Sequence, residues 1–261
     1  MTSRPIAVTR PYTVVALATL GLILLLAVGG TAIYLAELPL SSPVPLVFTP
    51  VAIGLILWAT LTHRWQRLGF TRRPRGAVSG SGWLPVVLPI VLVLALVVTT
   101  TGGAIDQPPA AWLGLAVFVA LVAFVEETIF RSVFLAVLSP KGLGAAVLVS
   151  SAGFALAHAA NLLGGQDLAS TLGQIGFAVA FGLFAACVYL RTGSIWPAIL
   201  FHAGFDMAQL GSVHQTPPAV DAVLTVLVLA GAAWLWSGIR RHGPGTRGVA
   251  PAATDAVATA R

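Results

Sequence analysis

Two adjacent glutamates and an arginine lie in one oily stretch of the chain, FVEETIFRSVF at 124–134. Glu127 and Arg131 are four residues apart, so on a helix they share a face and can form an ion pair. Glu126 is turned by about 100° from Glu127 and must face something else. Adjacent carboxylates repel, and burial favours the neutral form of at least one, which suits a general base. A structural salt bridge with a protonated spare glutamate explains this motif equally well.

Two further polar pairs occur at the same four-residue spacing: Phe154 and His158 in FALAH, and His202 and Asp206 in HAGFD. Each pair shares one helical face, and an aspartate can orient the imidazole above it. Taken alone, His158 fits a packed helix residue, and His202 with Asp206 fits a helix–helix hydrogen bond. Buried polar groups satisfy one another, so the three motifs together predict one shared pocket.

The chain that must position these residues is strongly apolar. Of its 261 residues, 57 % are hydrophobic and only 8 % are charged, with a mean hydropathy of +0.94. A soluble protein carries about 25 % charged residues, so we exclude that class. The apolar runs are long and continuous, which favours helices over a β-barrel. The sequence therefore predicts an all-α, polytopic membrane protein with about eight transmembrane helices, at roughly 13–35, 44–61, 83–101, 111–138, 142–159, 171–190, 194–210 and 219–237.

These helices divide by their polar content. The first three carry no intramembrane charge and are expected to be scaffold, the fourth, fifth and seventh carry the motifs, and the sixth and eighth are expected to be packing elements. We predict a single integral membrane domain over 1–261 with a motif-bearing catalytic core at 111–210. The Arg-, Gly- and Ser-rich segment 62–82 is expected to be a flexible surface loop, and the tail 243–261 is expected to be disordered.

Positive charges predict the orientation, because cytoplasmic connections collect Lys and Arg. Alternate connections hold Arg4, Arg10, Arg64, Arg67, Arg72, Arg73, Arg75, Lys141, Arg191, Arg240, Arg241, Arg247 and Arg261, and the other connections hold none. We therefore expect a multi-pass protein of the cell membrane with both termini cytoplasmic. The net charge of +6 is explained by these topology charges rather than by nucleic-acid binding. The single cysteine, Cys187, allows no internal disulfide.

The order EExxxR, FxxxH and HxxxD on separate membrane helices resembles the CAAX-processing and bacteriocin-immunity protease family, which includes the Ras-converting endoprotease. The resemblance covers roughly 111–210 and extends to the run TGSIWPAILFH. It implies intramembrane hydrolysis of a peptide bond in a membrane-associated peptide or protein. By this resemblance, Glu126 and His158 activate water. His202 and the residue at 206 stabilise the oxyanion, while Glu127 and Arg131 brace the site.

The chain departs from the eukaryotic members at Asp206, where they have asparagine. An ionised aspartate would repel an oxyanion, so Asp206 is either protonated or serves to orient His202. The resemblance to the Ras-converting enzyme favours a glutamate-type mechanism without a cofactor. A zinc metallopeptidase is the alternative, with Glu126, His158 and His202 as its ligands, although no HExxH motif is present.

Two other function classes stay open on the residues alone. Buried Glu, His and Asp also build proton relays in transporters, but the chain has no evident inverted repeat. A non-catalytic scaffold or immunity protein could keep the same motifs as structure. The sequence identifies neither the substrate nor the oligomeric state.

Overall fold

The computed structural model describes residues 9–37, 44–71, 80–163 and 165–244. Within these ranges the chain is helical and contains no strand, only an isolated bridge between Ala104 and Ser212. The predicted all-α class is confirmed. The longer helices are α2 (Pro11–Leu35), α3 (Val44–Leu61), α4 (Leu84–Thr100), α5 (Pro109–Glu127), α7 (Leu143–Ala157), α8 (Leu168–Thr192), α9 (Trp196–Leu210) and α10 (Pro218–His242).

Short helical segments extend several of these elements. A π-helix, η2 (Thr128–Phe134), continues α5 and is followed by α6 (Leu135–Leu138) and the 3₁₀ turn η3 (Ser139–Lys141). The 3₁₀ turns η1 (Gly80–Trp83) and η4 (His158–Leu162) precede α4 and follow α7.

Each of the eight predicted apolar segments corresponds to one of the longer helices. In the described ranges, five helical stretches are long and apolar enough to cross a membrane: Pro11–Ala32, Pro109–Lys141, Leu143–Leu162, Leu168–Thr192 and Pro218–His242. The apolar helices Phe48–Leu61 and Leu84–Thr100 are shorter, and α9, with 15 residues, falls below that length. The chain is therefore a multi-pass membrane protein.

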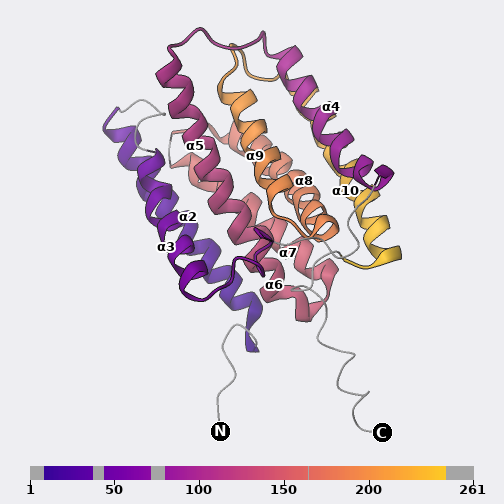
Figure 1. Ribbon diagram of the computed structural model, residues 1–261. Helices are drawn as coiled ribbons and strands as arrows, with labels where there is room; N and C mark the ends of the chain where they lie inside the picture. Colours follow the sequence, from indigo (N-terminus) through magenta and orange to yellow (C-terminus); the bar gives the residue numbers. More distant parts are fainter. Residues whose placement is uncertain (1–8, 38–43, 72–79, 164, 245–261) are drawn as a thin grey trace, which may run out of the picture.

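The motif-bearing helices lie in the middle of the bundle. Figure 1 shows α2 and α3 at one side and α4 and α10 at the other, with α5, α7, α8 and α9 between them. Within this arrangement α5 packs on α9 and α3, α7 packs on α8 and α2, and α10 packs on α8 and α4. Residues on the inner faces of α5, α7 and α9 are thus removed from lipid.

Sequence signals set the ends of α8. Asp167 precedes its first turn, and its carboxylate accepts the Ser170 backbone N–H at 3.0 Å. Hydrogen bonds from the hydroxyl and the backbone N–H of Ser170 lower the pKa of the Asp167 carboxyl below its ordinary value. The helix ends at Gly193, whose φ of 67° is left-handed and suits glycine.

In the middle of α8, Gly182 lets the helix approach α7, because a Cβ there would lie 3.0 Å from that of Ser151.

The segment 62–82 differs from the expected flexible loop. Four successive carbonyls, at residues 67–70, accept hydrogen bonds from the Tyr189 hydroxyl, the Ser132 hydroxyl, the Ile195 backbone N–H and the Trp196 indole N–H. This part of the segment is fastened to η2, to α8 and to the start of α9, so the expectation of flexibility is wrong for it. Residues 72–79 and most of the predicted disordered tail, 245–261, lie outside the described residues.

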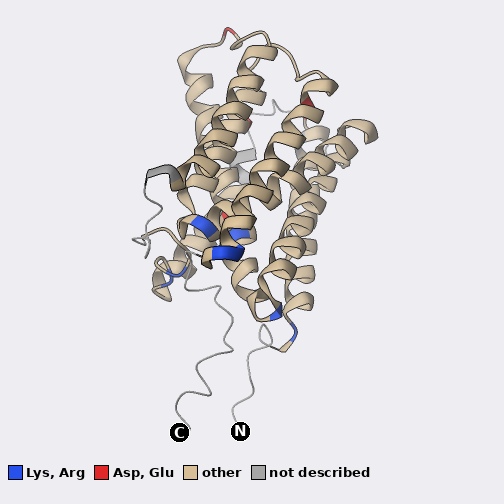
Figure 2. Cartoon of the chain, turned by 90° about the vertical axis from the view of Figure 1, so that its right-hand side faces the viewer, with Lys and Arg blue, Asp and Glu red and all other residues tan. Residues whose placement is uncertain are grey.

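Charge is distributed unevenly along the bundle. Figure 2 shows the described Lys and Arg residues in the lower half, where α10 ends, and the Asp and Glu residues at the upper end or in the interior. The start of α2 and the end of α10 lie at the same, lower end (Figure 1). This asymmetry supports the predicted orientation, which remains a proposal.

Candidate active site

The EExxxR motif lies where an α-helix becomes a π-helix. Glu126 and Glu127 are the last two residues of α5, and Arg131 lies within η2. Hydroxyl groups accompany the change in winding, since Thr128 donates to the Phe124 carbonyl and Ser150 of α7 donates to the Phe130 carbonyl. Single π-turns inside α-helices are rare and frequently occur at functional sites. The sequence analysis did not predict this turn.

Arg131 and Glu127 form the predicted ion pair in a fully buried position. The Arg131 Nε lies 3.0 Å from the Glu127 Oε2, and neither side chain is exposed. The contact lacks the alignment of a hydrogen bond, and none of the three guanidinium nitrogens has a hydrogen-bond partner among the described residues. Instead, the guanidinium carbon lies 4.1 Å from the centroid of the Phe154 ring, a cation–π contact with α7. The arginine therefore joins η2 to α7 as well as holding Glu127.

Glu127 also fixes His202 of α9. Its Oε1 lies 2.9 Å from the His202 Nδ1. A carboxylate only accepts hydrogen bonds, so Nδ1 carries a proton. The other ring nitrogen, Nε2, faces the Asp206 Oδ2 at 3.5 Å and the Glu126 Oε2 at 3.8 Å. Because both ring nitrogens face carboxyl groups, the geometry suits an imidazolium that donates from both.

His158 joins the site through Phe154. Its ring lies 4.9 Å from the Phe154 centroid, and the His202 ring lies 5.7 Å from the same centroid. The His158 Nδ1 lies 3.0 Å from the Phe154 carbonyl, which can only accept, so Nδ1–H is the donor. With Nδ1 protonated, the neutral His158 ring keeps a lone pair on Nε2 that can accept a proton.

Aromatic side chains of α8 form a further wall. The Phe181 ring lies 5.1 Å from the His202 ring, and Phe177 stacks on Phe205 at 4.9 Å. We had expected the sixth helix to be a packing element only. The signal was present, because Phe177, Phe181 and Phe184 recur at helical spacing. Nothing in that spacing identified His202 as their partner.

The structure brings the predicted residues together in two linked groups. Arg131, Glu127, His202, Glu126 and Asp206 form a continuous series of ionic contacts. His158 lies beside Phe154, and in the described part of the chain no hydrogen bond or ion pair links it to Glu126. Asp206 is the most open member, with 26 % of its side chain exposed, compared with 7 % for Glu126.

The side chains are not arranged around a metal ion. In the described ranges, no group of three or more His, Cys, Asp or Glu residues could hold one. The Nδ1 atoms of His158 and His202 donate within the protein, which leaves each Nε2 for another partner. Glu126, His158 and His202 do not converge into such a group, so we derive no step through a metal.

Comparison with known proteins gives one result. Residues 108–208 match the model of a protein family described as type II CAAX prenyl endopeptidase Rce1-like. No curated protein and no solved structure is significantly similar to the chain. The apolar helices make the chain a multi-pass membrane protein. The matched part, which includes every residue of the candidate site, is similar to the CAAX-type endopeptidases, the family that the three motifs resemble.

Proposed function

We propose that the protein is a glutamate-type intramembrane endopeptidase that cleaves a membrane-associated peptide or protein. The observation that carries the proposal is the contact series from Arg131 through Glu127 and His202 to Glu126 and Asp206. It combines side chains of α5, η2 and α9, and Phe154 of α7 extends it to His158 of η4.

Glu126 and His158 are the proposed bases for water. Glu127 is held by both Arg131 and His202, whereas among the described residues Glu126 has one ionic contact, with His202 at 3.8 Å. Glu126 is therefore the carboxylate that is free to act on water. It accepts a proton as the water oxygen bonds to the scissile carbonyl carbon. The Nε2 lone pair of His158 provides a second acceptor for the same water.

His202 is the proposed donor to the oxyanion. When the tetrahedral intermediate forms, negative charge collects on the former carbonyl oxygen. The Nε2–H of His202 donates to that oxygen, while Glu127 and Asp206 keep the ring in position. The carbon–nitrogen bond then breaks, and the proton taken by Glu126 passes to the leaving amine. An aspartate at position 206 in place of asparagine is compatible with this scheme, because the donor is the imidazole.

Glu127 and Arg131 are proposed as positioning residues. Glu127 fixes the rotation of His202 and its Nδ1 proton, and Arg131 holds the side chain of Glu127 in place. Neither residue needs to touch the substrate. In this proposal the site acts without a metal.

Cleavage of a library of membrane-anchored peptides tests the proposal. Glu126→Gln should lower turnover by about 10²–10⁴-fold, the usual contribution of a general base. Asp106→Asn is the matched control, because Asp106 is an exposed carboxylate outside the site; this variant should cleave like the wild type. Equal cleavage by all three proteins would contradict the role of Glu126. Cleavage by none of them would favour the scaffold function.

A further inference from the structure

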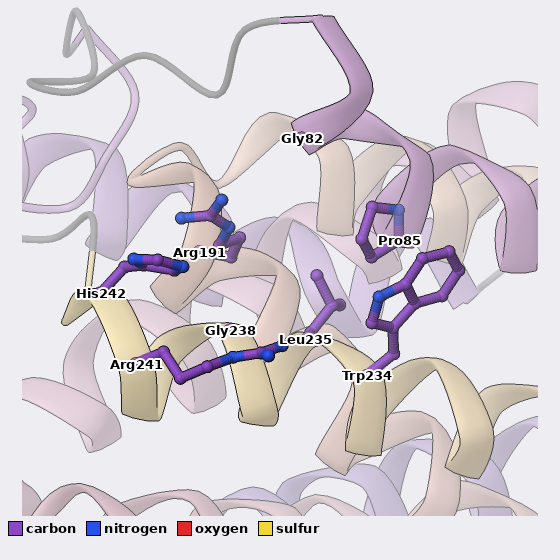
Figure 3. Close-up of a pocket in the computed structure, with 8 residues that line it drawn as sticks. All are labelled: Gly82, Pro85, Arg191, Trp234, Leu235, Gly238, Arg241 and His242. Carbon is purple, nitrogen blue, oxygen red and sulfur yellow. The ribbon is translucent and has the colours of Figure 1, made fainter.

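A second concave site lies apart from the candidate active site. It is a cavity of about 130 Å³ between the ends of α8 and α10 and the start of α4. Figure 3 shows Arg191 of α8 close to His242 of α10 at one side, and Pro85 of α4 beside Trp234 at the other. Arg241 lines the wall between them. Three nitrogen-rich side chains thus share one small volume.

The positive charge in this cavity has no counter-charge among the residues that the structure describes. In the described part of the chain, every ion pair belongs to the candidate active site, and none involves Arg191, Arg241 or His242. Arg241 donates only to the backbone carbonyl and the hydroxyl of Ser237, one turn earlier on its own helix. The described Asp and Glu residues lie in the interior or at the opposite end of the bundle (Figure 2). The described residues therefore offer this cavity no anion.

A simpler explanation is that these residues only set topology or offset the negative ends of two helices. That explanation requires basic residues near the helix ends but does not require them to meet in a cavity. Arg240 shows the difference, because it is an exposed neighbour of Arg241 on α10 and does not line the cavity. The residues that do line it come from α8 and α10 and converge.

The size and the setting of the cavity indicate the ligand. A water molecule occupies about 30 Å³ in the liquid, so the cavity has room for a group of four or five heavy atoms. Phosphate has that size, and guanidinium groups are its preferred partners. Trp234 is 42 % exposed at this end of the bundle, as is typical of tryptophan at a membrane–water interface.

We propose that this cavity binds a phosphate group, that of an anionic phospholipid headgroup. Arg191 and Arg241 bind the phosphate oxygens, His242 donates one ring N–H, and Trp234 lies against the glycerol region. The lipid would tie the ends of α8 and α10 together. Since α8 also carries Phe181 against His202, the bound lipid would steady one wall of the active site. The proposal does not depend on peptidase activity.

Native mass spectrometry of the purified full chain tests the site. The protein is exchanged into detergent with phosphatidylglycerol or with phosphatidylcholine, and retained lipid is counted. We expect the wild type and Arg240→Gln to keep one phosphatidylglycerol selectively. Each cavity arginine should contribute about five-fold to retention, so Arg191→Gln with Arg241→Gln should lose most of it. Equal retention by this double variant, or an equal loss in Arg240→Gln, would overturn the proposal.

Thermal unfolding separates the two sources of phosphate. Phosphatidylglycerol should raise the unfolding temperature of the wild type but not of the double variant, whereas inorganic phosphate should have a smaller effect. An equal shift with inorganic phosphate would keep the phosphate site but assign it to a soluble ligand. In phosphatidylcholine alone the double variant should be as stable as the wild type, because it removes uncompensated charges. Instability there would indicate a structural role and would count against the site.

Discussion

Arg131 is the residue whose surroundings most tightly constrain the site. It is fully buried, it is paired with one carboxylate, and its nitrogens have no hydrogen-bond partner among the described residues. Removing one member of a buried pair leaves the other charge uncompensated, which costs about 3–5 kcal/mol. We therefore expect Arg131→Met to lower the free energy of unfolding by that amount and to abolish activity. Chemical denaturation in detergent measures the first effect.

The double variant Glu127→Gln with Arg131→Met provides the control for that prediction. It removes both charges, so it should recover part of the lost stability. It should stay inactive, because an uncharged amide in place of the Glu127 carboxylate would no longer hold the Nδ1 proton of His202. A single Arg131→Met variant as stable as the wild type would contradict the buried pairing.

Asp206 is predicted to act through His202 rather than as a donor. It lies 3.5 Å from the His202 Nε2, and its side chain is partly open. Asp206→Asn keeps an oxygen that can orient the ring, so we expect its kcat/KM to stay within about ten-fold of the wild type. Asp206→Leu removes that oxygen and should lose about 10²-fold, the scale of one oxyanion-site group. Asparagine and leucine variants that are equally inactive would show that the negative charge itself is required.

Residue spacing predicted the contacts within single helices. Glu127 with Arg131 and His202 with Asp206 were inferred from four-residue spacing, and both pairs are in contact. The contact between Glu127 and His202 could not be inferred in this way. It joins residues 75 positions apart, and its formation depends on how α5 and α9 are rotated against each other.

Among the elements, η2 shows what apolar patterning fails to reveal. The run Thr128–Phe134 contains no proline or glycine and continues the α-helix before it, so composition gives no sign of the wider turn. The turn is accompanied by contacts to distant segments, namely Ser150 of α7 and the Leu68 carbonyl. The Ser132 contact is also one of the four that hold residues 67–70, which composition had marked as flexible. Elements that depend on such long-range hydrogen bonds cannot be predicted from a short stretch of sequence.

Gly182 tests the role of α8 as a wall of the site. A Cβ at this position would lie 3.0 and 3.1 Å from the Cβ and Cα of Ser151, so Gly182→Ala must push α8 away from α7. Overpacking of this kind costs about 1–3 kcal/mol. The shift should also move Phe181 from His202 and lower kcat. Thermal unfolding and a cleavage assay measure the two effects.

Gly173→Ala is the control on the same helix. A Cβ at Gly173 meets no atom within 4 Å. Because alanine favours helix over glycine by about 1 kcal/mol, this variant should be at least as stable as the wild type. If both alanine variants behaved alike, the close packing of α8 on α7 would not be needed for the site.

At the scale of the whole molecule, the orientation is the principal prediction. The basic residues gather at the end where α10 ends (Figure 2), and the connection between α4 and α5, which contains Asp106, lies at the other end (Figure 1). With the buried Cys187 replaced by serine, Asp106→Cys should react with a membrane-impermeant thiol reagent added outside intact cells. Gln66→Cys, at the basic end, should react only after permeabilisation. The opposite labelling pattern would reverse the orientation.

The overall plan of the molecule could be predicted from composition alone. All eight apolar segments became helices at the expected positions, because the bilayer leaves few alternatives to a long apolar run. The bounds of α4 and α9 fall within two residues of the predicted ones, whereas the continuation of α5 by η2, α6 and η3 depends on packing between neighbours. The convergence of basic residues in the cavity between α8 and α10 likewise depends on packing.

The central claim is that Glu126 and His158 activate water without a metal. Its most direct test is peptide cleavage by purified protein whose metal content has been measured. The wild type and Glu126→Gln are purified, their metal content is measured, and both are assayed on membrane-anchored peptides before and after treatment with a chelator. We predict cleavage by the wild type without stoichiometric metal, unchanged by the chelator and lost in Glu126→Gln. Cleavage that the chelator abolishes and zinc restores would contradict the glutamate-type mechanism.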